Sequence, residues 1–146
     1  MDTVSRHPVA VARCPLCLAL NKVRLDRLAD GPRCGECQRP LLLDRPLKVD
    51  DADVERILAG TTVPVVVDFY ADWCGPCRMM APVLDDFAQR RAGQVLVLKL
   101  DTDRNPVMPQ RFQIRGIPTL IVFRQGQETA RQVGVVPAEV LAQLVA

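Results

Sequence analysis

Residues 68–77 read Asp68-Phe69-Tyr70-Ala71-Asp72-Trp73-Cys74-Gly75-Pro76-Cys77 and mark the point where one kind of element gives way to another. The run from Val63 to Tyr70 predicts a strand buried on both faces, because it is almost entirely apolar and a single carboxylate interrupts it. From Cys74 to about Arg91 apolar residues recur at helical spacing, which predicts a helix. The two cysteines of this stretch therefore stand where a buried strand turns into a helix.

The pattern continues outward from this junction, from Leu47 onward, as an alternation of helices and strands. A helix is expected first, capped by Asp50 or Asp51 and ended by Gly60, and a strand is expected over Val95 to Leu100. A cap at Asn105, with Pro106 as first helical residue, precedes a short distorted helix over Pro109 to Phe112. The last expected elements are a hairpin of Thr119 to Phe123 with Glu128 to Val133, and a helix that begins at Pro137. This order predicts an α/β fold with a central mixed sheet and helices on both faces.

Cys74 and Cys77 are spaced for redox chemistry. Two cysteines three positions apart at the start of a helix lie on nearly the same face, so their sulfurs can close a small disulfide ring. Cys74 stands at the helix N-terminus, where unpaired N–H groups and the helix dipole favour a thiolate, whereas Cys77 lies one turn in and is expected to be more covered. Cys74 is therefore the expected attacking sulfur and Cys77 the resolving one, with Gly75 and Pro76 fixing the turn. A buried or metal-binding pair is the alternative for an isolated Cys-x-x-Cys.

Residues 68–77 closely resemble the active-site segment of the thioredoxin family, and a later stretch, Arg115-Gly116-Ile117-Pro118-Thr119, resembles its cis-proline loop. The likeness runs from Val63 to Gly134 and implies the thioredoxin fold. It also implies a shallow apolar surface that accepts an extended substrate chain. The residues expected to form this surface are Trp73, Gly116, Ile117, Pro118 and Gly134. A trans turn at Pro118 and a core position for Trp73 are the alternatives that the sequence leaves open.

Asp68 is the one carboxylate within the predicted buried strand. The family resemblance implies that it moves protons near Cys77, with Lys99 as its partner. The residues agree with this role, because desolvation in an apolar strand raises the pKa of an aspartate, and a carboxylate with a raised pKa can accept a thiol proton near neutral pH. An aspartate held in a purely structural pair with Lys99 is the alternative.

The other four cysteines form a pattern of their own, Cys14-x2-Cys17-x16-Cys34-x2-Cys37, which is the spacing of a four-cysteine zinc site. Residues 1–46 are too few to bury a core of their own and need a cross-link such as a bound metal ion. We therefore expect a small zinc-ribbon-like domain there and a thioredoxin domain over 47–146. Four thiolates leave no open position, so the metal is expected to be structural, with His7 at the surface. Two local disulfides or a second redox centre are the alternatives.

Composition narrows the remaining possibilities. The chain has 146 residues, and its six cysteines fall as three Cys-x-x-Cys pairs. Its apolar runs are far shorter than the ~20 residues that span a membrane. Within Met1 to Arg13, the brief Val-Ala-Val-Ala run is too short for the apolar core of a secretory signal, and no convincing cleavage site follows it. A cytoplasmic protein is therefore expected, in which paired cysteines indicate metal binding or redox catalysis. The net charge of +2 indicates a solvated surface, and no nucleic-acid partner is expected.

A zinc-binding front segment followed by a thioredoxin domain resembles the thioredoxin 2 subclass. This resemblance implies a monomeric protein-disulfide reductase that acts on oxidised proteins and is recycled by thioredoxin reductase and NADPH, with one structural Zn²⁺ and no bound organic cofactor. It also implies zinc release under oxidation as a switch. A disulfide oxidase or isomerase is a rival function, against which Gly75-Pro76 argues because the family's oxidants usually carry other dipeptides there. A zinc-ribbon adaptor, with the second domain as scaffold, is the rival from another class.

Overall fold

The computed structural model describes residues 7–146 and shows the predicted α/β arrangement. The elements are β1 (Val9–Arg13), β2 (Leu20–Arg24), the 3-10 helix η1 (Leu25–Asp30), β3 (Leu47–Val49), α1 (Asp51–Gly60), β4 (Val65–Tyr70), α2 (Gly75–Arg90), β5 (Leu96–Asp101), α3 (Val107–Arg111), β6 (Thr119–Arg124), β7 (Gln127–Val133) and α4 (Ala138–Leu144). Residues 1–6 lie outside the described residues. They are the first residues of the predicted front domain and of the stretch that was considered as a secretory signal. No helix in residues 7–146 is long and apolar enough to cross a membrane.

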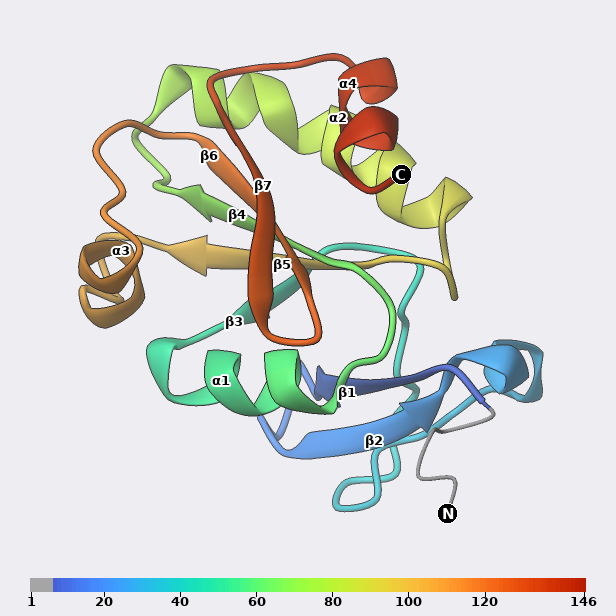
Figure 1. The fold of residues 1–146 in the computed structure, drawn as a ribbon. Coiled ribbons are helices and arrows are strands. Elements are labelled where there is room, and N and C mark those ends of the chain that lie inside the picture. The colour runs from blue at the N-terminus through green and yellow to red at the C-terminus, as the bar shows by residue number, and fades with distance from the viewer. Residues whose placement is uncertain (1–6) are drawn as a thin grey trace.

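The centre of the fold is a five-stranded sheet in the order β3-β5-β4-β6-β7. β4 pairs in parallel with β5 and antiparallel with β6, which makes the sheet mixed. Figure 1 shows α2 and α4 on one face of this sheet and α1 on the other. Strand alternation divides the buried residues in the same way, because Val66 packs with the α2 and α4 side chains, whereas Val65 and Val67 pack with those of α1. The predicted sheet with helices on both faces is confirmed.

The predicted helix starts need one correction. Asp50 occupies the N-cap position of α1, yet its side chain makes no cap hydrogen bond. The carboxylate of Asp51 instead accepts hydrogen bonds from the N–H groups of Val107 and Met108, each at 2.9 Å, and so caps α3. In the other direction, Asn105 Oδ1 accepts a hydrogen bond from the N–H of Asp51 at 2.9 Å. The expected cap at Asn105 was therefore wrong: Pro106 is the N-cap of α3, and Asn105 joins α3 to α1.

The front segment contains a β-hairpin that its sequence did not reveal. β1 and β2 pair antiparallel, and Figure 1 shows them beside α1. The backbone N–H of Val11 donates to Thr61 Oγ1 at 3.1 Å, and that of Val9 donates to Thr62 Oγ1 at 3.0 Å. Buried residues of β1, such as Ala12, belong to the same apolar cluster as those of α1. The front segment therefore completes a core that it shares with the sheet.

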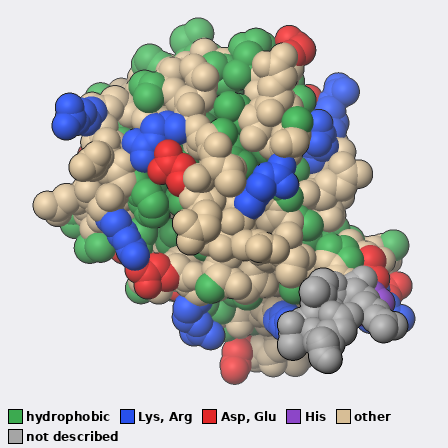
Figure 2. All heavy atoms as spheres, viewed as in Figure 1, with side chains coloured by type: hydrophobic (Ala, Val, Ile, Leu, Met, Phe, Trp, Pro, Cys, Tyr) green, Lys and Arg blue, Asp and Glu red, His purple; other side chains and the backbone are tan. Residues whose placement is uncertain are grey.

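Charged side chains are spread over the surface. Figure 2 shows Lys and Arg interspersed with Asp and Glu on the face it presents. Mixed charge of this kind is typical of a solvated face.

Candidate redox and metal sites

Cys74 and Cys77 form a disulfide at the start of α2, with their Cα atoms 5.2 Å apart. Cys74 is the N-cap residue of the helix, and its Sγ accepts a hydrogen bond from the N–H of Cys77 at 3.2 Å. Pro76 lies in the first turn, where its missing N–H costs no helical hydrogen bond. Both cysteines are 4% exposed, so the greater cover expected for Cys77 is not found. Position in the helix, rather than burial, distinguishes the two sulfurs.

The loop before β6 lies against this disulfide. The Ile117-Pro118 peptide bond is cis, as the resemblance implied. Cys74 Sγ lies 3.7 Å from the carbonyl oxygen of Ile117, and the Ile117 side chain packs on the small cluster that holds both cysteines. The N–H of Gly134 donates to the carbonyl of Pro118 at 2.8 Å, and Gly134 adopts a left-handed backbone with φ 93°. A Cβ at Gly116 would stand 3.4 Å from the Val133 side chain, so Gly116 lies beside Val133 at an ordinary contact distance.

Trp73 is 68% exposed, which excludes a core position for it. Its indole Nε1 donates to Asp103 Oδ2 at 2.8 Å, so the ring is held at the surface. Met79, Val133 and Val135 are exposed as well. An exposed aromatic ring and exposed aliphatic side chains near a disulfide provide an apolar contact surface.

Asp68 lies in the middle of β4 and is fully buried. By strand alternation it faces the same side of the sheet as Val66, which is the side that α2 covers. Neither carboxylate oxygen has a hydrogen-bond partner among residues 7–146. Burial raises the pKa of Asp68 to about 7, and the nearby charge of Lys99 opposes this shift.

Lys99 is the strand neighbour of Asp68 on β5. Its ammonium group lies 4.5 Å from the centre of the Tyr70 ring, and no ion pair within 4.0 Å joins it to Asp68 in the described part of the chain. The alternative of a structural Asp68–Lys99 pair is therefore not found. Asp68 is a buried carboxylate with a raised pKa and no direct partner, which is the environment of a group that can exchange a proton near neutral pH.

Replacing Asp68 with asparagine should stabilise the fold, increasingly so at high pH. The folded chain holds the Asp68 proton more tightly than the unfolded chain does, because the pKa of Asp68 is about 7 when folded and 3.8 for an ordinary aspartate. Stability that is present at low pH is therefore lost as the pH rises towards 7. Asparagine cannot ionise, so Asp68→Asn should gain about 2 kcal/mol at pH 5.5 and about 4 kcal/mol at pH 8.5. Urea unfolding at both values measures the gain. Asp85→Asn, at an exposed site on α2, is the control, and a gain independent of pH would contradict the prediction.

The sulfur atoms of Cys14, Cys17, Cys34 and Cys37 all lie within 4.8 Å of one another. Cys14 Sγ is 3.6 Å from Cys37 Sγ, and Cys17 Sγ is 3.4 Å from Cys34 Sγ. Four sulfurs around one tetrahedral Zn²⁺, each at about 2.3 Å, stand roughly 3.8 Å apart. The cluster is therefore compatible with a zinc site, and neither of the local pairs Cys14/Cys17 and Cys34/Cys37 is a disulfide.

The two Cys-x-x-Cys turns have the same backbone. The N–H of Leu18 donates to the carbonyl of Cys14 at 2.9 Å, and the N–H of Gln38 donates to that of Cys34 at 2.9 Å. Leu18 and Gln38 both adopt left-handed backbones, with φ 68° and 67°. Two matching turns whose sulfurs lie together are compatible with the paired knuckles of a zinc site. Residues 14–18 are called the first knuckle and residues 34–38 the second knuckle.

Asn21 of β2 contacts the second knuckle, and sequence reasoning missed it because a single asparagine carries no recognisable pattern. Its Oδ1 accepts from the N–H of Gly35 at 2.9 Å, while its Nδ2 lies 3.5 Å from Cys34 Sγ. The N–H of Cys37 is the main cause that lowers the pKa of Cys34 to about 6, and Asn21 contributes next. N–H groups directed at a thiolate are the outer contacts that orient a metal ligand.

A disulfide in the first turn of a helix, at the end of a buried strand and under a cis-proline loop, defines a thiol–disulfide oxidoreductase site. Comparison with known proteins gives the family. The family model described as Thioredoxin matches residues 45–146, and the one described as Thioredoxin 2, N-terminal, matches residues 13–39. The chain belongs to the thioredoxin family.

Individual relatives agree with this assignment. A thioredoxin of Haemophilus influenzae is 43% identical over 99 residues, which are 68% of this chain and 92% of that protein. Thioredoxin C-3 of Corynebacterium nephridii is 36% identical over 118 residues, 81% of each chain. Among solved structures, the N21Q mutant thioredoxin from Halobacterium salinarum NRC-1 superposes with a TM-score of 0.66 at 33% identity, covering 72% of this chain and 91% of that one.

Proposed function

We propose that this chain is a cytoplasmic, monomeric protein-disulfide reductase that thioredoxin reductase and NADPH return to the dithiol form. The observation that supports this most is the Cys74–Cys77 disulfide at the N-terminus of α2. Asp68, which is buried and has no hydrogen-bond partner among residues 7–146, faces the side of the sheet that α2 covers. The helix N-terminus favours a thiolate at Cys74, and the carboxylate provides an acceptor for the second proton. Reduction of insulin disulfides in the presence of NADPH and a thioredoxin reductase tests the proposal directly.

The proposed reaction has two sulfur exchanges. The Cys74 thiolate attacks one sulfur of the substrate disulfide, which forms a mixed disulfide and releases the other substrate sulfur as a thiol after protonation. Cys77 then loses its proton to Asp68 and attacks Cys74 Sγ. This breaks the mixed disulfide, releases the second substrate thiol and forms the Cys74–Cys77 disulfide. The substrate gains two electrons and two protons, which the reductase later replaces.

The substrate is proposed to lie along the loop that covers the disulfide. The backbone of Ile117 and Pro118 would pair with an extended substrate chain, with Gly116 and Gly134 beside it. Around Gly134 there is open space, which leaves room for the approach of that chain. Trp73 would cover the substrate beside the reacting sulfurs. Lys99 is proposed to limit the rise in the pKa of Asp68, since its charge opposes the effect of burial.

Asp68→Asn should slow the second exchange while leaving the first one intact. Because asparagine cannot accept the Cys77 proton, release of the mixed disulfide at pH 7 should fall by roughly 10- to 100-fold. In the unmodified chain this rate should rise as the pH passes through about 7, where Asp68 ionises, and the variant should lack that rise. Rapid mixing that follows Trp73 fluorescence separates the two exchanges. Equal release rates and equal pH profiles would contradict the role of Asp68.

The four front cysteines are proposed to hold one structural Zn²⁺ within a domain of residues 1–46, ahead of a thioredoxin domain over 47–146. The support is the sulfur cluster, the matching knuckles and the Asn21 contacts. Zn²⁺ would supply a fixed tetrahedral cross-link between the knuckles, and with four thiolate ligands it keeps no position for a substrate. No organic cofactor and no nucleic-acid partner enter the proposal.

A further inference from the structure

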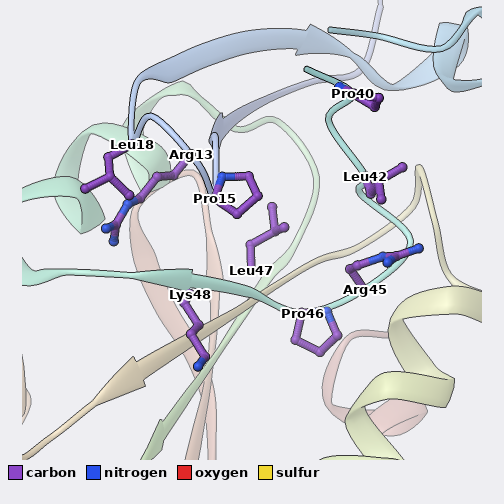
Figure 3. A pocket seen from close by; sticks show the side chains of 9 residues that line it. All are labelled: Arg13, Pro15, Leu18, Pro40, Leu42, Arg45, Pro46, Leu47 and Lys48. Atoms are coloured by element: carbon purple, nitrogen blue, oxygen red, sulfur yellow. The ribbon is translucent and has the colours of Figure 1, made fainter. Parts of the chain in front are cut away.

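A hollow of about 440 Å³ lies between the first knuckle and the chain that leads into β3. Figure 3 shows Pro15 and Leu18 of the knuckle on one side, Leu42 and Pro46 of the linker on the other, and Leu47 between them. These lining residues are apolar, and the volume is within the range of about 300–1,000 Å³ typical of ligand pockets. The hollow takes no part in the disulfide chemistry proposed above.

Several large apolar side chains are exposed on the described part of the chain. Two of them, Trp73 and Met79, lie close in sequence to the disulfide cysteines. Two others, Leu18 and Leu42, line the hollow, whereas Leu16 is exposed on the same knuckle as Leu18 but outside the hollow. The side chain of Leu18 is 52% exposed. Its backbone adopts a left-handed conformation. Exposed leucines around an apolar hollow mark a surface that another molecule covers.

The hollow shares part of its wall with a second hollow that reaches the chain neighbours of Trp73. The wall of the first hollow includes Arg13 and Lys48, and the same two residues line the second, polar hollow of about 200 Å³. That second hollow extends to Asp72 and Arg104, which are the chain neighbours of Trp73 and of its hydrogen-bond acceptor Asp103. A chain bound at the disulfide can therefore follow one surface to the knuckle.

The charge of the first hollow favours an acidic segment. Its charged lining residues are Arg13, Arg45 and Lys48, and none of the described residues that line it is acidic. Arg13 pairs with Asp50 and Asp53, and Arg45 pairs with Asp44, whereas Lys48 is exposed and makes no ion pair within residues 7–146. A free ammonium group beside an apolar hollow complements a carboxylate that flanks an apolar side chain.

We propose that this hollow is a second docking site for protein substrates, and that it binds a segment in which leucine-sized side chains are flanked by Asp or Glu. The assignment to substrates rests on the proposed reductase function. Because Pro15 and Leu18 belong to the first knuckle, the site exists only while that knuckle is ordered. The front domain thereby selects substrates that the disulfide region then reduces.

Direct binding tests the hollow without any redox step. The probe is a fluorescein-labelled, cysteine-free peptide, Glu-Glu-Leu-Leu-Glu-Glu, titrated with the zinc-loaded chain and followed by fluorescence anisotropy. Leu18→Asn combined with Leu42→Ser should raise the Kd at least tenfold, and asparagine accepts the left-handed backbone of residue 18. Leu16→Ser, on the same knuckle outside the hollow, should leave Kd unchanged. Equal binding by the double variant, or equal binding of a peptide with lysine in place of glutamate, would overturn the proposal.

Two disulfide peptides test whether the bound segment belongs to a substrate. Both carry a cystine and a twelve-residue Gly/Ser/Glu spacer, which reaches up to about 40 Å, and they end in Leu-Leu or in Ser-Ser between glutamates. The unmodified chain should reduce the leucine peptide with a KM at least tenfold lower at equal kcat, and the double variant should not distinguish the two. Equal KM values would overturn the assignment to substrates. Reduction of neither peptide, with binding of the cysteine-free probe intact, would instead contradict the reductase function.

Discussion

Cys74→Ser is expected to reduce no insulin disulfides, with a loss of at least about 1,000-fold, because it removes the sulfur that attacks the substrate. Serine at the N-cap of α2 keeps a side-chain acceptor at the position where Cys74 accepts from the N–H of Cys77, so the helix should start as before. The measurement is the rate of NADPH oxidation with thioredoxin reductase and insulin. Circular dichroism and zinc content should be unchanged, which separates lost chemistry from lost folding.

Cys77→Ser is the matched variant, because it keeps the attacking sulfur and removes the resolving one. It should capture substrate as a mixed disulfide at Cys74 and then stop, whereas Cys74→Ser should capture none. Mass spectrometry of the products distinguishes the two. The adaptor hypothesis makes the opposite prediction, since a zinc-ribbon module would work equally well in Cys74→Ser. Insulin reduction by that variant at the unmodified rate would contradict the proposed function.

Local sequence predicted most of the sheet and the placement of the disulfide. The buried run of β4 and the helical spacing of α2 depend on neighbouring residues alone, so their junction at Cys74 was predictable. The resemblance added the cis peptide bond at Pro118. Burial of the two cysteines was harder to predict, because it depends on Ile117, which packs against them from 40 or more positions away.

Other features depend on contacts between segments that the sequence does not link. Asp51 reads as a cap for its own helix, yet its carboxylate binds the N-terminus of α3, because Asn105 brings the two helix starts together. The pairing of β1 with β2 was not predicted either, because the run from Val9 to Arg13 is short. The free edge of β1 donates its N–H groups to the hydroxyls of Thr61 and Thr62, which lie far away in the sequence. In each case a distant side chain supplies the hydrogen bond that settles the local structure.

Removing the proposed Zn²⁺ should have a larger effect on stability than any single core substitution. Structural Zn²⁺ binding contributes on the order of 10–16 kcal/mol to the folding of zinc-finger peptides at neutral pH, which is comparable to the whole stability of a typical chain. Cys34→Ser, which changes one of the two fully buried cysteines of the sulfur cluster, should therefore lower the unfolding temperature by at least about 10 °C. Glu36→Gln, exposed on the same knuckle, is the control and should change it by less than about 2 °C.

The loss should spread beyond the front segment, because the apolar cluster runs without a break from Ala12 and Cys34 to Ile57 of α1. Without its knuckles the hairpin loses the contacts that hold it on α1, and the backbone N–H of Val11 loses Thr61 as acceptor. Hydrogen exchange in Cys34→Ser or after chelation should therefore speed up in β1, in β2 and in α1, while β4 and β6 keep their protection. Faster exchange confined to residues 7–46 would show instead that the front domain folds and unfolds independently of the sheet.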